Sequence, residues 1–186
     1  MAETLEHRCL SPWKGAAVGA VIVFIVQSVS WMALPFHRWT IREFKDAAPI
    51  VQAVEANAPG SGVYIVANDP KGQKAPTDPF LFVSYRKEGW GAMGVSMAFD
   101  FVLLMLGAFL WTWILGKIPG LKLKDAALYG CFFGLAVGAL GAMPNTVWWK
   151  FSCPFSLMYV ADSTVAWTIA SLALSRCYAS ACELPR

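Results

Sequence analysis

Two aspartates, Asp100 and Asp162, lie within long apolar stretches of the sequence and are the residues best suited to chemistry. A charged carboxylate inside a membrane costs at least about 2.5–3.5 kcal/mol, so acids at such positions usually serve a function. Asp100 lies roughly 12 Å into its stretch at 1.5 Å per residue, and Asp162 lies at a similar depth counted from the same side. Either the acids form a polar pocket that binds a cation, an amine or a headgroup, or they pair with polar groups and fix the helix arrangement.

Small residues share a helical face with each acid. Ala166 and Ala170 follow Asp162 at helical spacing, and Ser96 and Ala108 lie on the same face as Asp100. Faces of small residues usually contact other helices, so both acids are expected to face the bundle interior. Lys150 is the cation expected to reach them. The predicted lining of the pocket comprises Asp100, Asp162, Lys150, Trp148, Trp149, Asn145 and Gln27.

Standard catalytic and metal-binding motifs are absent from the sequence. There is no H-E-x-x-H, G-x-S-x-G or P-loop pattern, and the two histidines, His7 and His37, are predicted on opposite sides of the membrane. The five cysteines include no C-x-x-C, and no two are predicted to meet on an oxidising side. We therefore predict a protein that is not an enzyme and that has no metal site, cofactor or disulfide.

The elements that must hold the two acids are membrane-spanning helices. The 186 residues are 57% hydrophobic and only 15% charged, against about 25% charged residues in soluble domains. A net charge of +3 is too small and too dispersed to indicate a nucleic-acid partner. Spans of about 20 apolar residues are long enough to cross a bilayer. Four such spans are predicted, at residues 15–35, 92–118, 125–143 and 155–175, and prolines mark their ends.

Lysines in short loops predict the orientation of these spans. Lys117, Lys122 and Lys124 crowd the loop between the second and third spans, which places this loop in the cytoplasm. Residues 1–14 and 176–186 are then cytoplasmic, and residues 36–91 and the turn 144–154 are outside. The first span could instead be a cleaved signal peptide. We interpret it as a retained anchor, because signal peptides have apolar regions of about 7–15 residues.

Residues 36–91 are predicted to fold as a small cap of one helix and two strands. Thr40 and Glu43 have the spacing of a capping box, and apolar residues follow at helical spacing. Pro49 interrupts this pattern, so the helix is expected to kink or to restart there, and to end at Asn57. Residues 62–67 and 80–85 read as strands. The predicted fold class is an all-α membrane protein, a bundle of four transmembrane helices with an extracytoplasmic α+β cap.

Glycines recur at four-residue spacing in two of the predicted spans. Such stripes let helix backbones approach closely in lipid. We expect them to pack within the bundle, with contact to a partner subunit as the alternative, and we expect Trp167 to be a packing residue. The predicted helix-packing glycines are Gly15, Gly19, Gly130, Gly134, Gly138 and Gly141.

Three segments of the chain resemble a group of small bacterial four-helix membrane proteins. They are SWMALPFHRWT, EANAPGSGVYIVAND and WWKFSCPFSLMYVADSTVAWTIASLAL. The resemblance implies a bacterial inner-membrane protein and carries no known activity or catalytic residue. The layout is also similar to that of claudin-like proteins, whose external W…C…C pattern is absent here.

Two functional hypotheses follow from these observations. The first is a non-enzymatic accessory or scaffold subunit of a larger inner-membrane complex, with lipid and other integral membrane subunits as partners. The alternative is a small binding or transport protein with an outer-leaflet polar pocket that uses Asp100 and Asp162.

Overall fold

The computed structural model describes residues 11–66, 79–89 and 91–182, which form a bundle of helices and a small two-stranded sheet. Four helices are long and apolar enough to cross a membrane. They are α1 (Pro12–Ala33), α4 (Met93–Leu115), α5 (Leu123–Trp149) and α6 (Cys153–Cys182). The shorter elements are α2 (Phe36–Thr40), α3 (Ala48–Asn57), β1 (Gly62–Val66) and β2 (Leu81–Tyr85).

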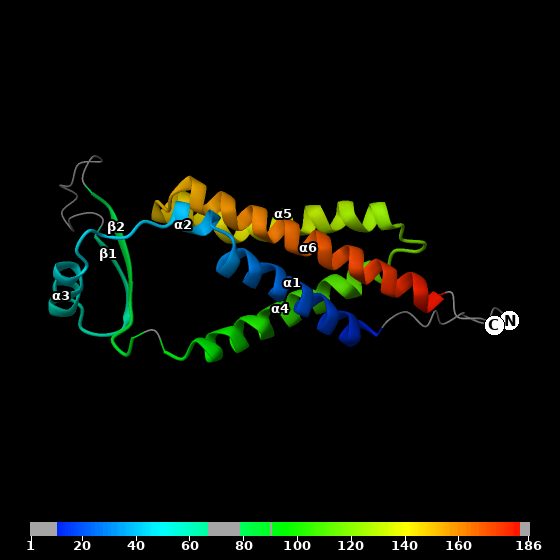
Figure 1. Ribbon diagram of the computed structural model, residues 1–186, viewed down its shortest axis with the longest axis horizontal. Helices are drawn as coiled ribbons and strands as arrows, with labels where there is room; N and C mark the ends of the chain where they lie inside the picture. The colour runs from blue at the N-terminus through cyan, green and yellow to red at the C-terminus, as the bar shows by residue number, and fades with distance from the viewer. Residues whose placement is uncertain (1–10, 67–78, 90, 183–186) are drawn as a thin grey trace.

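The four long helices form two crossing pairs. Helices α5 and α6 run antiparallel along their length, while α1 packs against both α4 and α6 (Figure 1). The start of α1 and the end of α6 lie at one end of the bundle, and α2, α3 and the sheet lie at the other (Figure 1). We call these the termini end and the cap end. The chain therefore traverses the bundle four times, in the order predicted.

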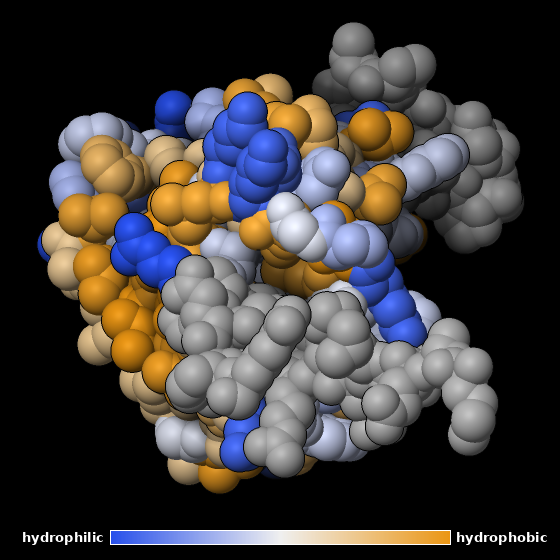
Figure 2. Space-filling view, turned by 90° about the vertical axis from the view of Figure 1, so that its right-hand side faces the viewer, coloured by the Kyte–Doolittle hydropathy of each residue, from blue (hydrophilic) through white to orange (hydrophobic). Residues whose placement is uncertain are grey.

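The termini end carries exposed cationic residues. Hydrophilic residues gather where this end faces the viewer, and hydrophobic residues cover a flank of the bundle (Figure 2). Two lysines of the short connection between α4 and α5, and one in the first turn of α5, are exposed. The exposed cationic residues of this end are Lys14, Lys117, Lys122, Lys124 and Arg176.

Helix α5 continues past the proline that was expected to end it. The predicted third span stops at residue 143, but Pro144 lies inside α5, which ends at Trp149. Proline removes one helical hydrogen bond, and the remaining bonds keep this last turn in place. The amides of Lys150 and Phe151 both donate to the Asn145 carbonyl, and Lys150 adopts a left-handed conformation, which ends the helix. The expected turn 144–154 is thus reduced to residues 150–152.

The capping-box prediction in the cap is wrong. Thr40 ends α2 instead of starting a helix, because its hydroxyl donates to the His37 carbonyl at 2.9 Å. Helix α3 begins at Ala48, whose amide donates to the Asp46 carboxylate at 3.0 Å, and Pro49 occupies its first turn. Of the two alternatives expected at Pro49, a kink or a restart, the structure has a helix that starts there, and the predicted end at Asn57 is confirmed.

The two predicted strands pair as an antiparallel hairpin. Gly62 lies opposite Tyr85, and Val66 lies opposite Leu81. The Phe82 ring packs against Trp149 and Phe151 at centroid distances of 5.1 and 5.7 Å. A hairpin alone is marginal in water, so this aromatic contact with the bundle helps to hold it.

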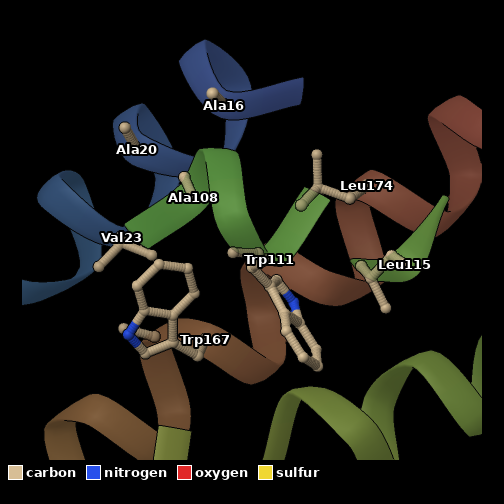
Figure 3. Packing of buried hydrophobic residues seen from close by; sticks show 10 residues of the cluster. Ala16, Ala20, Val23, Ala108, Trp111, Leu115, Trp167 and Leu174 are labelled. Atoms are coloured by element: carbon tan, nitrogen blue, oxygen red, sulfur yellow. The ribbon is translucent and has the colours of Figure 1, made fainter. Parts of the chain in front are cut away.

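The hydrophobic core lies where α1, α4 and α6 converge (Figure 3). Trp111 stacks on Phe133 of α5 with a centroid distance of 4.2 Å, and its indole N–H donates to Ser171 at 2.7 Å. Trp167 is only 3% exposed and meets Phe133 edge-on. The interpretation of Trp167 as a packing residue is confirmed.

The glycine stripes serve contacts inside the bundle. Gly130, Gly134 and Gly138 face α6 so closely that a Cβ on Gly134 would lie 2.5 Å from the Ser163 carbonyl oxygen. Gly15 and Gly19 of α1 lie against Thr112 and Ala108 of α4. Gly141 departs from the prediction, because a Cβ there would meet nothing within 4 Å.

Candidate functional site

A cavity of about 860 Å³ lies at the cap end of the bundle, between α1, α4, α5 and α6. It exists because α4 packs on α1 and diverges from α5 and α6 towards its own N-terminus (Figure 1). The lining contains aromatic, methionine, small and polar side chains. The polar side chains of the lining are Gln27, Ser28, Ser96, Asp100, Asn145, Ser156, Tyr159, Asp162 and Ser163.

Asp100 and Asp162 both line this cavity. Their environments differ. Asp100 is exposed and makes no hydrogen bond or ion pair with any residue that the structure describes. The Asp162 side chain is 13% exposed and is held by two neighbours. The cavity therefore joins one free carboxylate and one paired carboxylate, at the similar depth that the sequence predicts.

His37 and Ser30 are the partners of Asp162. The His37 Nε2 atom lies 2.8 Å from Oδ2 of Asp162, and the Ser30 hydroxyl donates to Oδ1 at 2.7 Å. Nε2 also lies 3.2 Å from the Ser30 oxygen. The Trp31 ring stacks on the His37 ring at a centroid distance of 3.8 Å and an interplanar angle of 14°. We call Ser30, His37 and Asp162 the histidine cluster.

Local chain geometry brings the cluster together. Helix α1 ends at Ala33, Leu34 is extended, and Pro35 starts α2. The chain therefore turns sharply and returns His37 to Ser30, seven residues earlier. Asp162 lies in α6, which packs against both α1 and α2.

The histidine cluster is not arranged as a catalytic triad. In a Ser-His-Asp triad the acid contacts Nδ1 while the serine contacts Nε2. Here Asp162 and Ser30 both contact Nε2, and Ser30 donates its hydrogen to the acid. The Ser30 hydroxyl is thus not activated as a nucleophile by His37.

The other predicted lining residues divide into two groups. Gln27 and Asn145 line the cavity as predicted, whereas Lys150, Trp148 and Trp149 do not. Lys150 adopts a left-handed conformation at the end of α5, and its ammonium donates to the Val147 carbonyl at 2.8 Å. It is not the cationic partner of Asp162, because the helix C-terminus attracts its charge. Trp148 is 72% exposed, and Trp149 packs on Phe82 of the cap.

Sequence reasoning missed His37, Ser30 and Tyr159 as site residues. A usable signal for His37 existed, since a histidine two residues after an apolar span, with Phe36 and Trp39 close by in the sequence, needs a polar partner when it is buried. Tyr159 precedes Asp162 by nearly one helical turn and meets Trp31 edge-on at 5.4 Å. It therefore belongs to the same polar and aromatic group.

The chemistry of the cavity favours a cation with an apolar body. Two carboxylates supply negative charge, and neither lysine nor arginine contributes to the described lining. The aromatic residues of the lining are Phe24, Trp31, Phe151, Phe155 and Tyr159. Aromatic faces attract cations, and ammonium groups are commonly bound by such rings.

No metal centre is evident in the part of the chain that the structure describes, where no three His, Cys, Asp or Glu side chains are grouped. Cys131, Cys153 and Cys177 are free thiols. The predicted lack of a metal or cofactor stays a prediction.

Comparison with known proteins finds no family model, no curated protein and no solved structure that matches this chain. The resemblance to small bacterial membrane proteins therefore stays a prediction, and the function must be argued from the site.

Proposed function

We propose that this protein binds an amphiphilic organic cation in the cavity at the cap end. The observation that carries the proposal is the presence of Asp100 and Asp162 in one cavity whose other walls are largely aromatic and aliphatic. The free carboxylate of Asp100 supplies an uncompensated charge, and the apolar walls suit the body of the ligand.

The size of the cavity supports a ligand larger than an inorganic ion. Sites for small organic molecules commonly measure about 300–1,000 Å³, and this cavity measures about 860 Å³. The thioethers of Met32, Met93 and Met97 add flexible apolar contacts that adapt to ligands of different shape. A compact metal ion would leave most of this space unfilled.

The accessory-subunit hypothesis stays a prediction. It depended partly on glycine-rich faces being available to a partner, but Gly130, Gly134 and Gly138 are occupied by α6. The cavity, in contrast, is not filled by the chain itself, so ligand binding is the function that the geometry supports best.

The proposal is tested with the full chain purified in detergent micelles and tetraphenylphosphonium as the probe. We expect saturable binding by calorimetry, with Asp100→Asn and Asp162→Asn each weakening it at least ~10-fold, because a charge pair near 4 Å contributes up to about 4 kcal/mol at an effective dielectric of 20. Asp125→Asn, in the first turn of α5 at the termini end, is the matched control and should leave the affinity unchanged.

Two results would contradict cation binding. One is equal affinity for tetraphenylmethane, a neutral molecule of the same shape, which would make the cavity an apolar groove only. The other is a chain that binds no probe and purifies with a stoichiometric membrane subunit, which would favour the accessory-subunit hypothesis.

We also propose that the protein is a multi-pass protein of a bacterial inner membrane, with its termini in the cytoplasm and its cap outside. The exposed lysines and arginine at the termini end support this orientation under the positive-inside rule.

Cys153 and Cys177 lie near opposite ends of α6, roughly 36 Å apart at 1.5 Å per residue. In single-cysteine variants, an impermeant maleimide should label Cys153 on intact cells and Cys177 only after permeabilisation. Labelling of Cys177 on intact cells would reverse the orientation.

A further inference from the structure

We propose that the cavity has a second ligand, a proton held on His37, and that binding of the organic cation releases this proton. The chain would then exchange one cation for one proton at the cap end. This inference rests on the proposed cation binding and adds the histidine cluster to it.

The hydrogen-bond network assigns the titrating atom. The Ser30 hydroxyl gives its hydrogen to Asp162, so its contact with His37 requires a hydrogen on Nε2 of the ring. Nε2 thus stays protonated, between Ser30 and Asp162, in both charge states of the imidazole. The proton that is gained and lost is the one on Nδ1.

Because His37 is buried, the charge of its protonated ring must be stabilised by Asp162. His37 is only 3% exposed, and Nδ1 has no hydrogen-bond partner among the residues that the structure describes. A protonated ring therefore leaves a buried N–H unpaired, and its charge is offset mainly by the Asp162 carboxylate beside it. The stacked ring of Trp31 adds a smaller attraction for the imidazolium.

A cation in the cavity competes for the same carboxylate. Asp162 lines the cavity and contacts His37 at once, so a bound cation places a second positive charge next to the imidazolium. Repulsion between the two charges favours loss of the Nδ1 proton to water, while the neutral ring keeps its Nε2 hydrogen. The balance is one cation bound and one proton released, with no bond to carbon made or broken.

The other titratable groups around the histidine cluster are few. Helix α6 contributes Tyr159 besides Asp162, and α4 contributes Asp100 across the cavity. The cavity-lining residues of α1 and α5 include no titratable side chain. Arg38 follows His37 in α2 and is exposed. Asp100 is therefore the competing proton acceptor that an experiment must separate from His37.

Calorimetry of tetraphenylphosphonium binding provides the test, using buffers of different ionisation enthalpy between pH 5.5 and 8.5. We expect release of one proton per cation at the acid end and none at the alkaline end. Affinity should rise with pH by up to about tenfold per unit and then level off, as linkage to one proton requires. His37→Gln keeps an amide donor towards Ser30 and Asp162, so it should bind without proton release and without pH dependence. Arg38→Gln is the matched control and should behave as the wild type.

A second measurement leaves His37 in place. The chain has two histidines, so His7→Gln gives a protein with a single imidazole. Its ¹⁵N resonances at the acid end should change from the imidazolium pattern to the neutral pattern, with Nε2 protonated, when the cation is added.

The outcomes distinguish this inference from the proposed function. Failure of the wild type to bind the cation at any pH would overturn both. Binding without proton release would overturn the proton site alone. Proton release that persists in His37→Gln and disappears in Asp100→Asn would assign the proton to Asp100 and overturn the role of His37.

Discussion

The two ends of the bundle use the same helices in opposite ways. At the termini end, the side chains of Trp111, Leu115 and Leu174 fill the space between α1, α4 and α6. At the cap end, the same three helices and α5 surround a cavity of about 860 Å³. The difference lies in where small residues allow close approach. Gly15 and Gly19 bring α1 onto α4 in the first half of α1, whereas α4 diverges from α5 and α6 towards the cap end (Figure 1).

This contrast separates the packed part of the molecule from the part to which we assign the proposed binding. Filling and close contact hold the helices together at one end, whereas at the other end polar side chains such as Asp100 line the cavity of the proposed binding site. Substitutions at the termini end should therefore lower stability, whereas substitutions at the cap end should mainly affect binding.

The largest effect is expected from Trp167→Ala. Removing this buried ring leaves a hole against Gly107 and Phe133, and should lower the free energy of unfolding by about 3 kcal/mol. Trp148→Ala is the control, since an exposed ring should cost less than about 0.5 kcal/mol. Thermal or denaturant unfolding in micelles measures both. Equal costs would show that the termini end is not the stabilising core.

A smaller loss is expected from Gly134→Ala. The new Cβ would lie 2.5 Å from the Ser163 carbonyl oxygen and 2.7 Å from the Thr164 Cα, both backbone atoms that cannot rotate away. Separating α5 from α6 should cost about 1–3 kcal/mol, as overpacking usually does. Gly141→Ala lies two turns further along α5 and meets nothing within 4 Å. Its melting temperature should stay the same or rise, and a fall would contradict the division between the ends.

The two acids should respond differently to neutralisation. Asp162→Asn loses the charge that pairs with His37 and keeps only one of the two acceptor oxygens that face Ser30 and His37, which should cost about 1 kcal/mol. Asp100→Asn removes a charge that pairs with none of the described residues, so stability should be unchanged or higher. The same melts at pH 7 compare them. A larger loss for Asp100→Asn would contradict the assignment of Asp162 as the paired acid and Asp100 as the free one.

The smallest effect concerns the hairpin of the cap, which lies beyond the cavity at the cap end. The Ser61 hydroxyl donates to the Glu88 carboxylate at 2.7 Å and, with the Glu88 backbone amide, holds the pKa of Glu88 below its ordinary value of 4.5. Because a lowered pKa favours the folded cap only while the carboxylate is ionised, this contribution is present above pH 4.5 and fades as acid protonates Glu88. Ser61→Ala should raise the pKa of Glu88 towards the ordinary value, as measured by NMR titration. Ser84→Ala, also in the hairpin, should not.

The sequence predicts the helices and strands more accurately than the contacts between them. Length and apolarity are local properties, so the four long helices and the two strands could be predicted residue by residue. Helix ends depend on hydrogen bonds further along the chain. The Asn145 carbonyl receives two amides, and the Thr146 hydroxyl donates to Ser156 of α6, so α5 extends beyond Pro144.

The candidate site was predicted in part for the same reason. Depth along a helix is a count of residues, so the sequence could place both acids at one level. The partner of Asp162 depends on rotation about the helix axis and on the turn at Pro35, which returns His37 to α6 from 125 positions away in the sequence. Lys150 is near in sequence, but its ammonium is held by the end of its own helix.

The short connection between α5 and α6 has a consequence for biogenesis. With residues 150–152 alone between them, and with Gly134 and Gly138 against the α6 backbone, these helices can leave the translocon as one preassembled hairpin. Helix α6 is the least apolar of the four and carries Asp162, so its entry into lipid by itself is the least favourable. Entry beside α5 lets the more apolar helix assist the less apolar one, and it brings Asp162 to Ser30 and His37, which are synthesised earlier.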